Sequence, residues 1–479
     1  MQSYNKNSFM ELSTNVGRFN LRGKTVLIPE MNRIGAHLFA ANFRGFGVNA
    51  EVLETYKGCD LGKQYTSGKE CYPCLITLGD MLHFAEKEKK NNPGGFKPEN
   101  YVYFLPEAEG PCRFGMYNKF QRLVFNSLPE LSRLKIASLS ARDGYCLDGI
   151  LEKDKVLDFR KSGYFSFVIA DILDRLAWRV RPYERKEGMT NAFIKNSTDE
   201  MADSFERYGS RIRFDRILDK LEEIVKEAKD IIDPNIPPKP LIGIVGEIFL
   251  RMHADSNQDL IGMLERHGAE VVNASLAEWL NFVTYNKLRE SREGLRFNLK
   301  QFNLKGIRGN LKNIAGFGAT LLYQQFRQNQ AYRRVAPFID LAQDHKISHL
   351  RDILEKDDSF SFQVITETSI SIAAILEYAR MGCNGVVNVY PFTCMPGMTT
   401  SAIAKPIMNK QGVPYLDTPC DGTTQPGREA AVRTFVYQAE QHFRQKGRVP
   451  EPAGNRGRYF NSRGSKRQGT GMMPLPVEQ

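Results

Sequence analysis

Four cysteines are the residues of this sequence whose types and spacing predict chemistry. Cys71 and Cys74 lie three residues apart in KECYPCLITLGDM, at the start of a segment patterned like an amphipathic helix. Cys112 lies in EGPCRFGMYN and Cys394 in FTCMPGMTTS, and each of these segments comes between a strand-like and a helix-like run. A helix N-terminus lowers the pKa of a thiol, because free amide N–H groups point outward there. The expected chemistry is therefore that of thiolate ligands or nucleophiles.

The spacing of these cysteines separates three kinds of site. The CxPC form of the first pair is typical of a thioredoxin-like dithiol, which would leave Cys112 and Cys394 without a role. Zinc prefers two compact pairs, whereas here single cysteines follow about 38 and then about 280 residues later, with no paired histidines. Iron-sulfur clusters accept scattered thiolates. We therefore expect a 4Fe-4S cluster held by Cys71, Cys74, Cys112 and Cys394; a set of only three thiolates and a larger or double cluster stay open.

The remaining cysteines and two glutamates are weaker candidates. Cys383 follows a helix-like run and is expected in the core, where isolated cysteines are most often found. Glu247 and Glu367 lie at strand ends, where a carboxylate acts either as an acid or base or as a helix cap. Three further cysteines lie in loops near strand ends and stay open as additional ligands: Cys59, Cys146 and Cys420.

Strand-like and helix-like runs alternate in two stretches of the chain. The first stretch has strand-like runs at 23–31, 49–55, 101–108 and 134–140, and the second has them at 241–248, 385–392 and 413–419. This alternation predicts right-handed crossovers and parallel sheets. Because ligands gather beyond the carboxyl ends of the strands in such sheets, the cysteine loops are expected to meet there.

The expected fold is α/β, with two tandem Rossmann-like, doubly wound parallel-sheet domains. A chain of 479 residues is too long for one ordinary core. The first domain covers residues 1–160, and the second covers 239–284 and 336–445. The other expected parts are a helical spacer at 161–238, a basic helical insertion at 285–335 and a disordered basic tail at 446–479.

Positive charge is concentrated in two segments. The net charge is +11, but residues 285–335 hold eleven Lys or Arg against two Glu, and residues 444–479 hold eight against two. The rest of the chain is therefore slightly acidic. A solvated helical face and a flexible end are the plain interpretation; the functional one is a docking surface for an acidic protein partner at 285–335. Nucleic-acid binding is disfavoured, because the chain has no RRM-type aromatic platform and no helix-turn-helix signature.

The N-terminus has no apolar signal region, and no run of about 18 or more residues is uncharged and apolar. We therefore expect a cytoplasmic protein with no membrane contact. In that compartment its eight cysteines are expected to be ligands, catalysts or buried thiols and not a disulfide framework.

Five segments of the chain resemble a known family. They are GKTVLIPEMNRIGAHLFAANFRGFGVNAEVLET, TSGKECYPCLITLGDML, GPCRFGMYNKFQRL, KPLIGIVGEIFLRMHADSNQDLIGMLERHGAEV and NVYPFTCMPGMTTSAIAKP. Over roughly residues 20–445 they resemble the iron-sulfur portion of the large activase-related proteins of the 2-hydroxyacyl-CoA dehydratase and benzoyl-CoA reductase system. The resemblance implies tandem Rossmann-like domains around an oxygen-sensitive cluster, with Cys112, Cys394 and one or both of Cys71 and Cys74 as ligands. It also implies ATP-coupled, low-potential electron transfer or reduction of a small or CoA-linked substrate.

The ATP-binding module of those proteins has no counterpart in this sequence. GRFNLRGKT at 17–25 has five residues between its glycines where a P-loop has four, and it precedes its strand. We therefore expect no ATP site on this chain, an ATP-hydrolysing activase acting in trans, and a dehydratase or reductase subunit as a second partner. A non-enzymatic cluster carrier or scaffold and a CxPC thiol-disulfide redox protein are the alternatives, and whether the chain is itself an enzyme stays open.

Overall fold

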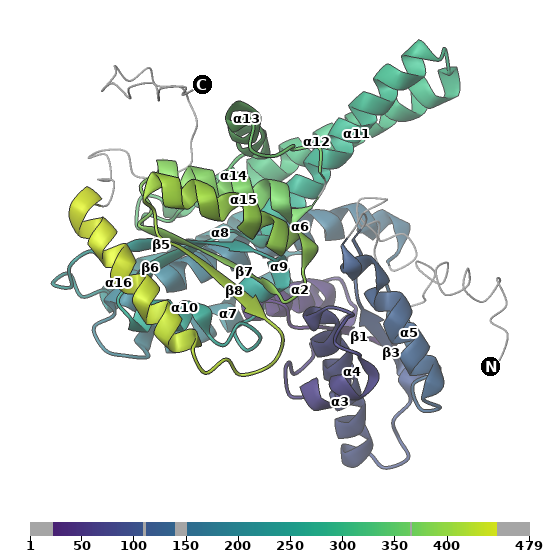
Figure 1. The fold of residues 1–479 in the computed structure, drawn as a ribbon. Coiled ribbons are helices and arrows are strands. Elements are labelled where there is room, and N and C mark those ends of the chain that lie inside the picture. The colour runs from purple at the N-terminus through teal and green to yellow at the C-terminus, as the bar shows by residue number, and fades with distance from the viewer. Residues whose placement is uncertain (1–22, 109–111, 139–150, 365, 448–479) are drawn as a thin grey trace.

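The computed structural model describes residues 23–108, 112–138, 151–364 and 366–447 (Figure 1). These residues form two four-stranded sheets in which every strand pair is parallel, which confirms the predicted α/β class. The first sheet, in the order β2-β1-β3-β4, contains β1 (Thr25–Ile28), β2 (Asn49–Val52), β3 (Tyr101–Phe104) and β4 (Lys135–Ala137). The second, in the order β6-β5-β7-β8, contains β5 (Leu241–Gly246), β6 (Glu270–Asn273), β7 (Gly385–Pro391) and β8 (Tyr415–Cys420).

Helices cover both faces of the first sheet. Successive side chains of a strand point to opposite faces, so Val26 and Ile28 of β1 pack against α2 while Leu27 packs against α4 and α5. The short helix α3, which packs on α4, was not predicted from the sequence. The helices of this half are α2 (Arg33–Gly45), α3 (Cys59–Tyr65), α4 (Tyr72–Asn91) and α5 (Tyr117–Ser127).

The second sheet is covered in the same way. Val245 and Val386 face α14 and α15, whereas Ile244 and Val387 face α10 and α16. Both sheets are therefore buried on both faces, as parallel sheets generally are. The helices of this half are α9 (Ile248–Met252), α10 (Leu260–Arg266), α13 (Ile347–Asp357), α14 (Glu367–Arg380), α15 (Met395–Gln411) and α16 (Arg428–Lys446).

Helix α6 (Lys153–Val180) lies between the two sheets and begins before the predicted spacer boundary at 161. Between 162 and 180 nearly every residue is buried, as expected for a helix that is apolar on all sides. With α7 (Met189–Tyr208) and α8 (Phe214–Ala228) it shares one core with Leu38 of the first half and Ile244 of the second. The two halves are thus joined through common packing and not through a linker.

Helices α11 (Leu276–Lys300) and α12 (Leu304–Val335) form a hairpin that projects from the body (Figure 1). The predicted basic insertion is helical, as expected, but its first helix begins at 276 and not at 285. The GFG at 316–318 lies inside α12. No helix in the described part of the chain is long and apolar enough to cross a lipid bilayer.

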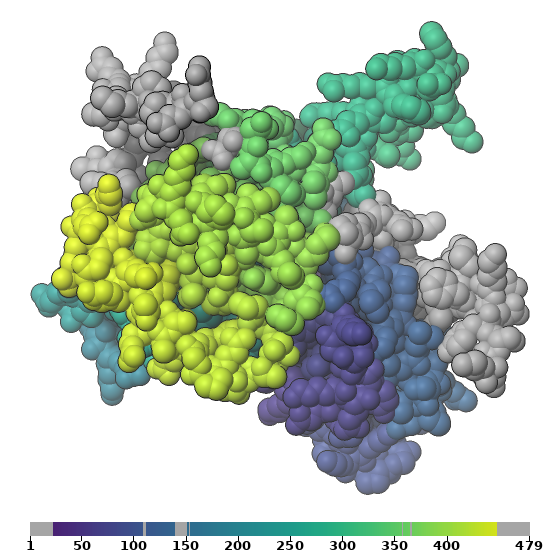
Figure 2. Space-filling view, in the orientation of Figure 1, coloured from purple at the N-terminus to yellow at the C-terminus, as the bar shows by residue number. Residues whose placement is uncertain are grey.

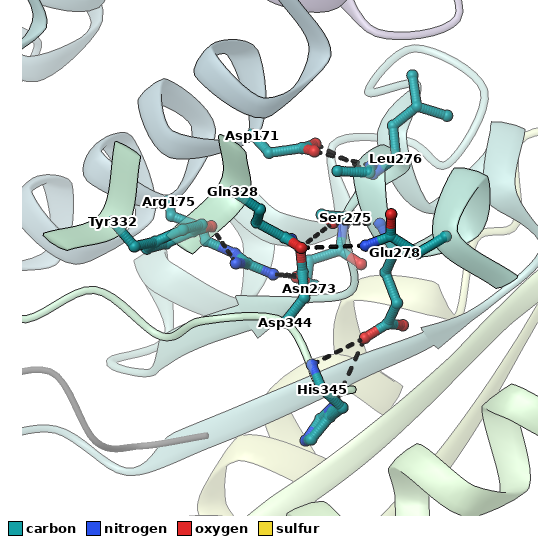
Figure 3. A network of polar contacts seen from close by, with 12 residues as sticks. Asp171, Arg175, Asn273, Ser275, Leu276, Glu278, Gln328, Tyr332, Asp344 and His345 are labelled. Atoms are coloured by element: carbon teal, nitrogen blue, oxygen red, sulfur yellow. Dashed lines mark hydrogen bonds and ion pairs between the residues drawn. The ribbon is translucent and has the colours of Figure 1, made fainter. Parts of the chain in front are cut away.

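A buried polar network anchors the base of this hairpin (Figure 3). Arg175 of α6 donates to the hydroxyl of Tyr332 on α12 and pairs with the carboxylate of Asp344. Asp344 also accepts a hydrogen bond of 2.6 Å from the hydroxyl of Ser275, directly before α11. The carboxylate of Asp171, also on α6, accepts from two backbone N–H groups at the start of α11, at 3.0 and 2.9 Å. One side of α6 thereby holds both helices of the hairpin.

We predict that Phe165→Ala destabilises both halves together. Phe165 of α6 is fully buried, and its ring centroid lies 4.7 Å from that of Phe214. The cavity should lower the free energy of unfolding by about 3–5 kcal/mol, without splitting the transition. Urea unfolding followed by far-UV circular dichroism and by the fluorescence of Trp178 and Trp279 tests this.

The control for this prediction is Leu157→Ala on the same helix. Leu157 is 60% exposed, so its truncation should change the free energy of unfolding by less than about 0.5 kcal/mol. Non-coincident fluorescence and dichroism transitions in the Phe165 variant would show that the two halves unfold independently.

Candidate functional site

The loops that follow the strands of the two sheets meet at one place. The hydroxyl of Thr55, after β2, lies 2.8 Å from Nε2 of His253, after β5. A side chain on Gly422, after β8, would collide with the ring of Tyr72 at the start of α4. The carboxyl ends of both sheets therefore face the same interface, which is where ligands gather in open α/β sheets.

Cys71, Cys112 and Cys394 lie together at this interface. The thiol of Cys71 raises the pKa of the other two, and the carboxylate of Glu247 raises the pKa of all three. Cys71 and Cys394 are the residues directly before α4 and α15, and Cys112 precedes the short 3-10 turn Arg113–Met116. Three of the four predicted ligands are thus brought within electrostatic reach of one another.

A backbone N–H of the turn that follows each cysteine favours its thiolate form. These N–H groups belong to Tyr72 for Cys71, to Phe114 for Cys112 and to Gly397 for Cys394. Burial outweighs them and raises the pKa of Cys71 to about 11 and that of the other two as well. The thiols are therefore protonated near neutral pH, and binding a metal would release their protons.

The backbone is strained at two of these loops. Cys71 has φ +97° and Thr393, next to Cys394, has φ +66°, a region that L-residues other than Gly rarely occupy. Such a conformation costs about 1–3 kcal/mol and persists only where the surroundings enforce it. At Cys71 the fully buried Tyr117 contributes by donating a hydrogen bond to the sulfur.

Arg113 joins all three cysteine loops. The residue directly follows Cys112, and its guanidinium donates to the backbone carbonyl of Lys69 in the Cys71 loop. It also donates to the carbonyl and the hydroxyl of Thr393 in the Cys394 loop, at 2.9 and 3.1 Å. Arg113 was not among the predicted site residues. A charged residue next to a cysteine in a Gly- and Pro-rich motif was the signal in the sequence that could have indicated it.

Cys74 is more deeply buried than Cys71 and Cys112, and burial and next the nearby Cys71 raise its pKa. It is fully buried in the core of the first half, against Leu78 and Tyr103 and beside the side chain of Gln121. Burial raises its pKa, as it does for Cys71. A redox dithiol needs a thiol with a lowered pKa, so the geometry does not favour the thioredoxin-like interpretation.

Cys420 is a further thiol near this interface. It ends β8, and both terminal nitrogens of Arg428 lie 3.3 Å from its sulfur. Glu247 raises its pKa, although burial contributes more. Cys383 lies in the core of the second half, as expected. Cys146 falls outside the described residues.

The chain can turn at the end of β5, directly before Glu247, because residue 246 is a glycine. Gly246 has φ +123°, and a Cβ there would lie 1.9 Å from the carbonyl oxygen of Val389. The Glu247 carboxylate accepts from the backbone N–H groups of Phe249 and Leu250 at 3.1 and 2.9 Å, so it caps α9. It also lies beside the three thiols, so the two roles considered for it are compatible.

The two glutamates raise the proton affinity of the site. Burial, and next the nearby Glu367, raises the pKa of Glu247 to about 7. Burial also raises the pKa of Glu367, which lies in the first turn of α14 and is 6% exposed. A carboxyl with a pKa near neutrality can hold or release a proton beside the thiols.

A second polar chain crosses the interface and was not anticipated. His253 Nδ1 accepts from the backbone N–H of Ser256 at 3.1 Å, so in the neutral ring Nε2 carries the proton and donates to the Thr55 hydroxyl. Thr55 in turn donates to Asp80 at 2.8 Å. Burial raises the pKa of Asp80 to about 7, and Asp80 in turn helps raise that of Cys59 to about 12. Asp80 is a carboxylate within an apolar run of α4, and that was the signal available in the sequence.

No family model matches the chain, and no curated protein matches its sequence. In the part of the chain that the structure describes, no group of three or more His, Cys, Asp or Glu side chains is arranged to hold a single metal ion. The candidate functional groups are therefore the thiols, the carboxylates and Arg113 at the interface.

We predict that Arg113→Ala loosens the three cysteine loops. Losing hydrogen bonds worth about 1–2 kcal/mol in total should raise the alkylation rates of Cys71, Cys112 and Cys394 roughly fivefold or more. Iodoacetamide labelling followed by peptide mass spectrometry measures each rate separately. Arg133→Ala is the control, because that arginine is highly exposed and its side chain lies 3.9 Å from that of Glu99. Equal rates in both variants would show that Arg113 does not hold the loops.

We also predict a pH-dependent stability difference between the protein and its Asp80→Asn variant. Between about pH 4 and pH 7 folded Asp80 keeps a proton that the unfolded chain has lost, so its contribution to the free energy of unfolding falls as pH rises. The variant lacks this slope, which is at most about 1.4 kcal/mol per pH unit. Urea unfolding from pH 5 to pH 8 measures it, with the exposed Asp60→Asn as control. A constant difference between the two proteins would contradict the assignment.

Proposed function

We propose that this chain is an iron-sulfur protein with a 4Fe-4S cluster between two Rossmann-like halves, held by the thiolates of Cys71, Cys112 and Cys394. One observation carries the proposal: three cysteine loops from the two halves converge, joined by the hydrogen bonds of Arg113, and a backbone N–H favours the thiolate of each cysteine. Backbone N–H donors around thiolates are a recurrent feature of iron-sulfur sites and tune their potential.

The donor set of the site suits such a cluster with three thiolates better than with four. Cys74 belongs to the core of the first half, so it contributes packing there and no ligand. Glu247 contributes, after burial, to the raised pKa of Cys420 as it does to those of the three thiols, so Glu247 and Cys420 are the candidates for a fourth ligand. When bound, the cluster would supply one-electron transfer at low potential.

The chain's own residues orient and protect this site. Arg113 holds the three loops in register, and Tyr117 fixes the Cys71 sulfur. Glu247 offers a proton-exchanging group beside the sulfurs. Cys71 and Cys112 are only half-buried, which leaves one edge of the site within reach of a docked protein.

The proposed role is ATP-coupled, low-potential electron transfer. The support is the resemblance of the cysteine motifs to the activase-related proteins of the 2-hydroxyacyl-CoA dehydratase and benzoyl-CoA reductase system. An activase acting in trans would hydrolyse ATP, and a dehydratase or reductase subunit, or a small or CoA-linked substrate, would receive the electron. The half-buried edge also suits a cluster carrier or scaffold, which would lose its cluster to a partner without turnover.

We predict that the thiols at the interface, and not the other buried ones, retain iron. Anaerobically reconstituted protein should hold about four iron and four sulfide per chain. Cys71→Ser, Cys112→Ser and Cys394→Ser should each retain less than about a quarter of that iron, because each removes a thiolate. Cys74→Ala and Cys383→Ala are matched controls and should retain it. Iron and sulfide quantitation with EPR after reduction measures the outcome.

Two results would contradict this assignment. Iron-free protein from a strictly anaerobic preparation would remove the cluster proposal, and zinc in its place would indicate a structural site. Loss of iron in a Cys74→Ala variant that still folds would show that all four cysteines are ligands. Circular dichroism of each variant separates ligand loss from unfolding.

A further inference from the structure

Helix α12 carries a row of apolar side chains on the face turned away from α11. Leu304, Leu311, Leu322 and Phe326 are 80, 52, 69 and 57% exposed, and Ala315 between them is exposed as well. Their spacings of seven, four, seven and four residues keep all of them on one helix face. At 1.5 Å per residue the row is roughly 33 Å long. We call these residues, together with Gly318, the α12 seam.

The middle of the α12 seam is made of small residues. A Cβ built on Gly316 or Gly318 would meet nothing within 4 Å, and Ala315 and Ala319 stand next to them. Glycine within an exposed helix is destabilising, so packing inside this chain does not account for it. Small residues let the backbone of a second helix approach closely, whereas a lipid surface gains nothing from them.

One flank of the α12 seam is basic. Lys305, Arg308 and Lys312 border the seam on that side, and no acidic residue occurs between Glu293 and Asp340. A helix that packs on the seam is therefore matched by Asp or Glu at the positions that face this flank. A second copy of α12 is disfavoured, because it has no acidic residue to set against the basic flank.

No acidic segment of this chain complements the α12 seam. Residues 1–22 hold three Lys or Arg against one Glu, and residues 448–479 hold six against two. The hairpin stands clear of the body, so the seam is accessible (Figure 2). The network around Arg175 and Asp344 fixes its base, so the seam is presented on a rigid support.

We propose that the α12 seam docks an amphipathic α-helix of a partner protein, whose apolar stripe covers the seam and whose flanks carry Asp and Glu. The helix packs closest at Ala315 and Gly318, with its acidic flanks against Lys305, Arg308 and Lys312. This surface is independent of the thiol site, so neither conclusion depends on the other.

The test uses the full chain and a labelled probe peptide of four heptads, with Leu at a and d and Glu at e and g. Glu at e and g keeps the peptide from pairing with itself. In fluorescence anisotropy the acidic peptide should bind at least about tenfold tighter than a matched peptide with Lys at e and g, and salt should weaken it. Equal affinities, or no binding by the acidic peptide, would overturn the proposal.

Variants of the α12 seam locate the binding. Leu311→Asn combined with Leu322→Asn should weaken the acidic peptide at least about tenfold, since apolar contacts set the dissociation rate. Tyr437→Asn on α16 is the matched control, because Tyr437 is 61% exposed and far from the seam in sequence. Unchanged affinity in the double variant would place the binding elsewhere.

Gly318→Leu distinguishes a helical partner from a membrane. The position has room for a side chain, so the variant should fold; the added bulk should keep a partner helix away and weaken the peptide at least about tenfold. The same added Leu would strengthen binding to phosphatidylcholine vesicles that contain phosphatidylserine, if the seam were a membrane anchor. Stronger vesicle binding with unchanged peptide binding would overturn the proposal.

Discussion

The burial of residues 162–180 of helix α6 on all sides is the constraint on which the arrangement of the two halves depends. This mostly apolar part of the helix must be covered everywhere, and its neighbours are α2, the spacer helices and the second sheet. Arg175 and Asp171 on the same helix are buried charges, which are tolerable only when paired and hydrogen-bonded. Their partners are the base of the hairpin and the edge of the second sheet. Packing and charge pairing together thus fix the two sheets with their carboxyl ends toward one interface.

This fixed framework explains how strained loops persist at the thiol site. Positive φ at Cys71 and Thr393 costs about 1–3 kcal/mol each, and isolated loops would relax. Here the Cys71 loop joins helices α3 and α4, and the Thr393 loop joins strand β7 to helix α15. These elements pack into the protein's cores, so relaxation of the loops would disturb that packing. The guanidinium of Arg113 adds the only contact described that touches all three cysteine loops, over separations of 44 and 280 residues. The site is therefore stabilised both by the packing of the flanking helices and strands and by the hydrogen bonds of Arg113.

The features that could be predicted from the sequence are those that depend on local residue pattern and on topology. Alternating strands and helices predicted the parallel sheets, and loops after strands were expected to bring the cysteines together. The orientation of Cys74 was not predictable from CxxC spacing, because residues three apart share a face in a helix. Cys71 lies directly before α4 at φ +97° and is partly buried at the edge of the core that contains Cys74. The hydrogen-bond partners of Arg113 and His253 were not predictable either. Contacts between residues so far apart in the chain produce no regular spacing in the sequence.

Electrostatics limits what the thiol site can bind. Three thiolates beside Glu247 and Glu367 would place several negative charges in a buried region, where Coulomb repulsion is strong. The positive groups of the described chain at this interface include Arg113, Arg428 beside Cys420, and Arg251, which lowers the pKa of both glutamates. Since burial and mutual repulsion already raise the pKa of Glu247 to about 7, added negative charge would raise it further. Negative charge added beside Glu247 therefore favours the protonated form of its carboxyl.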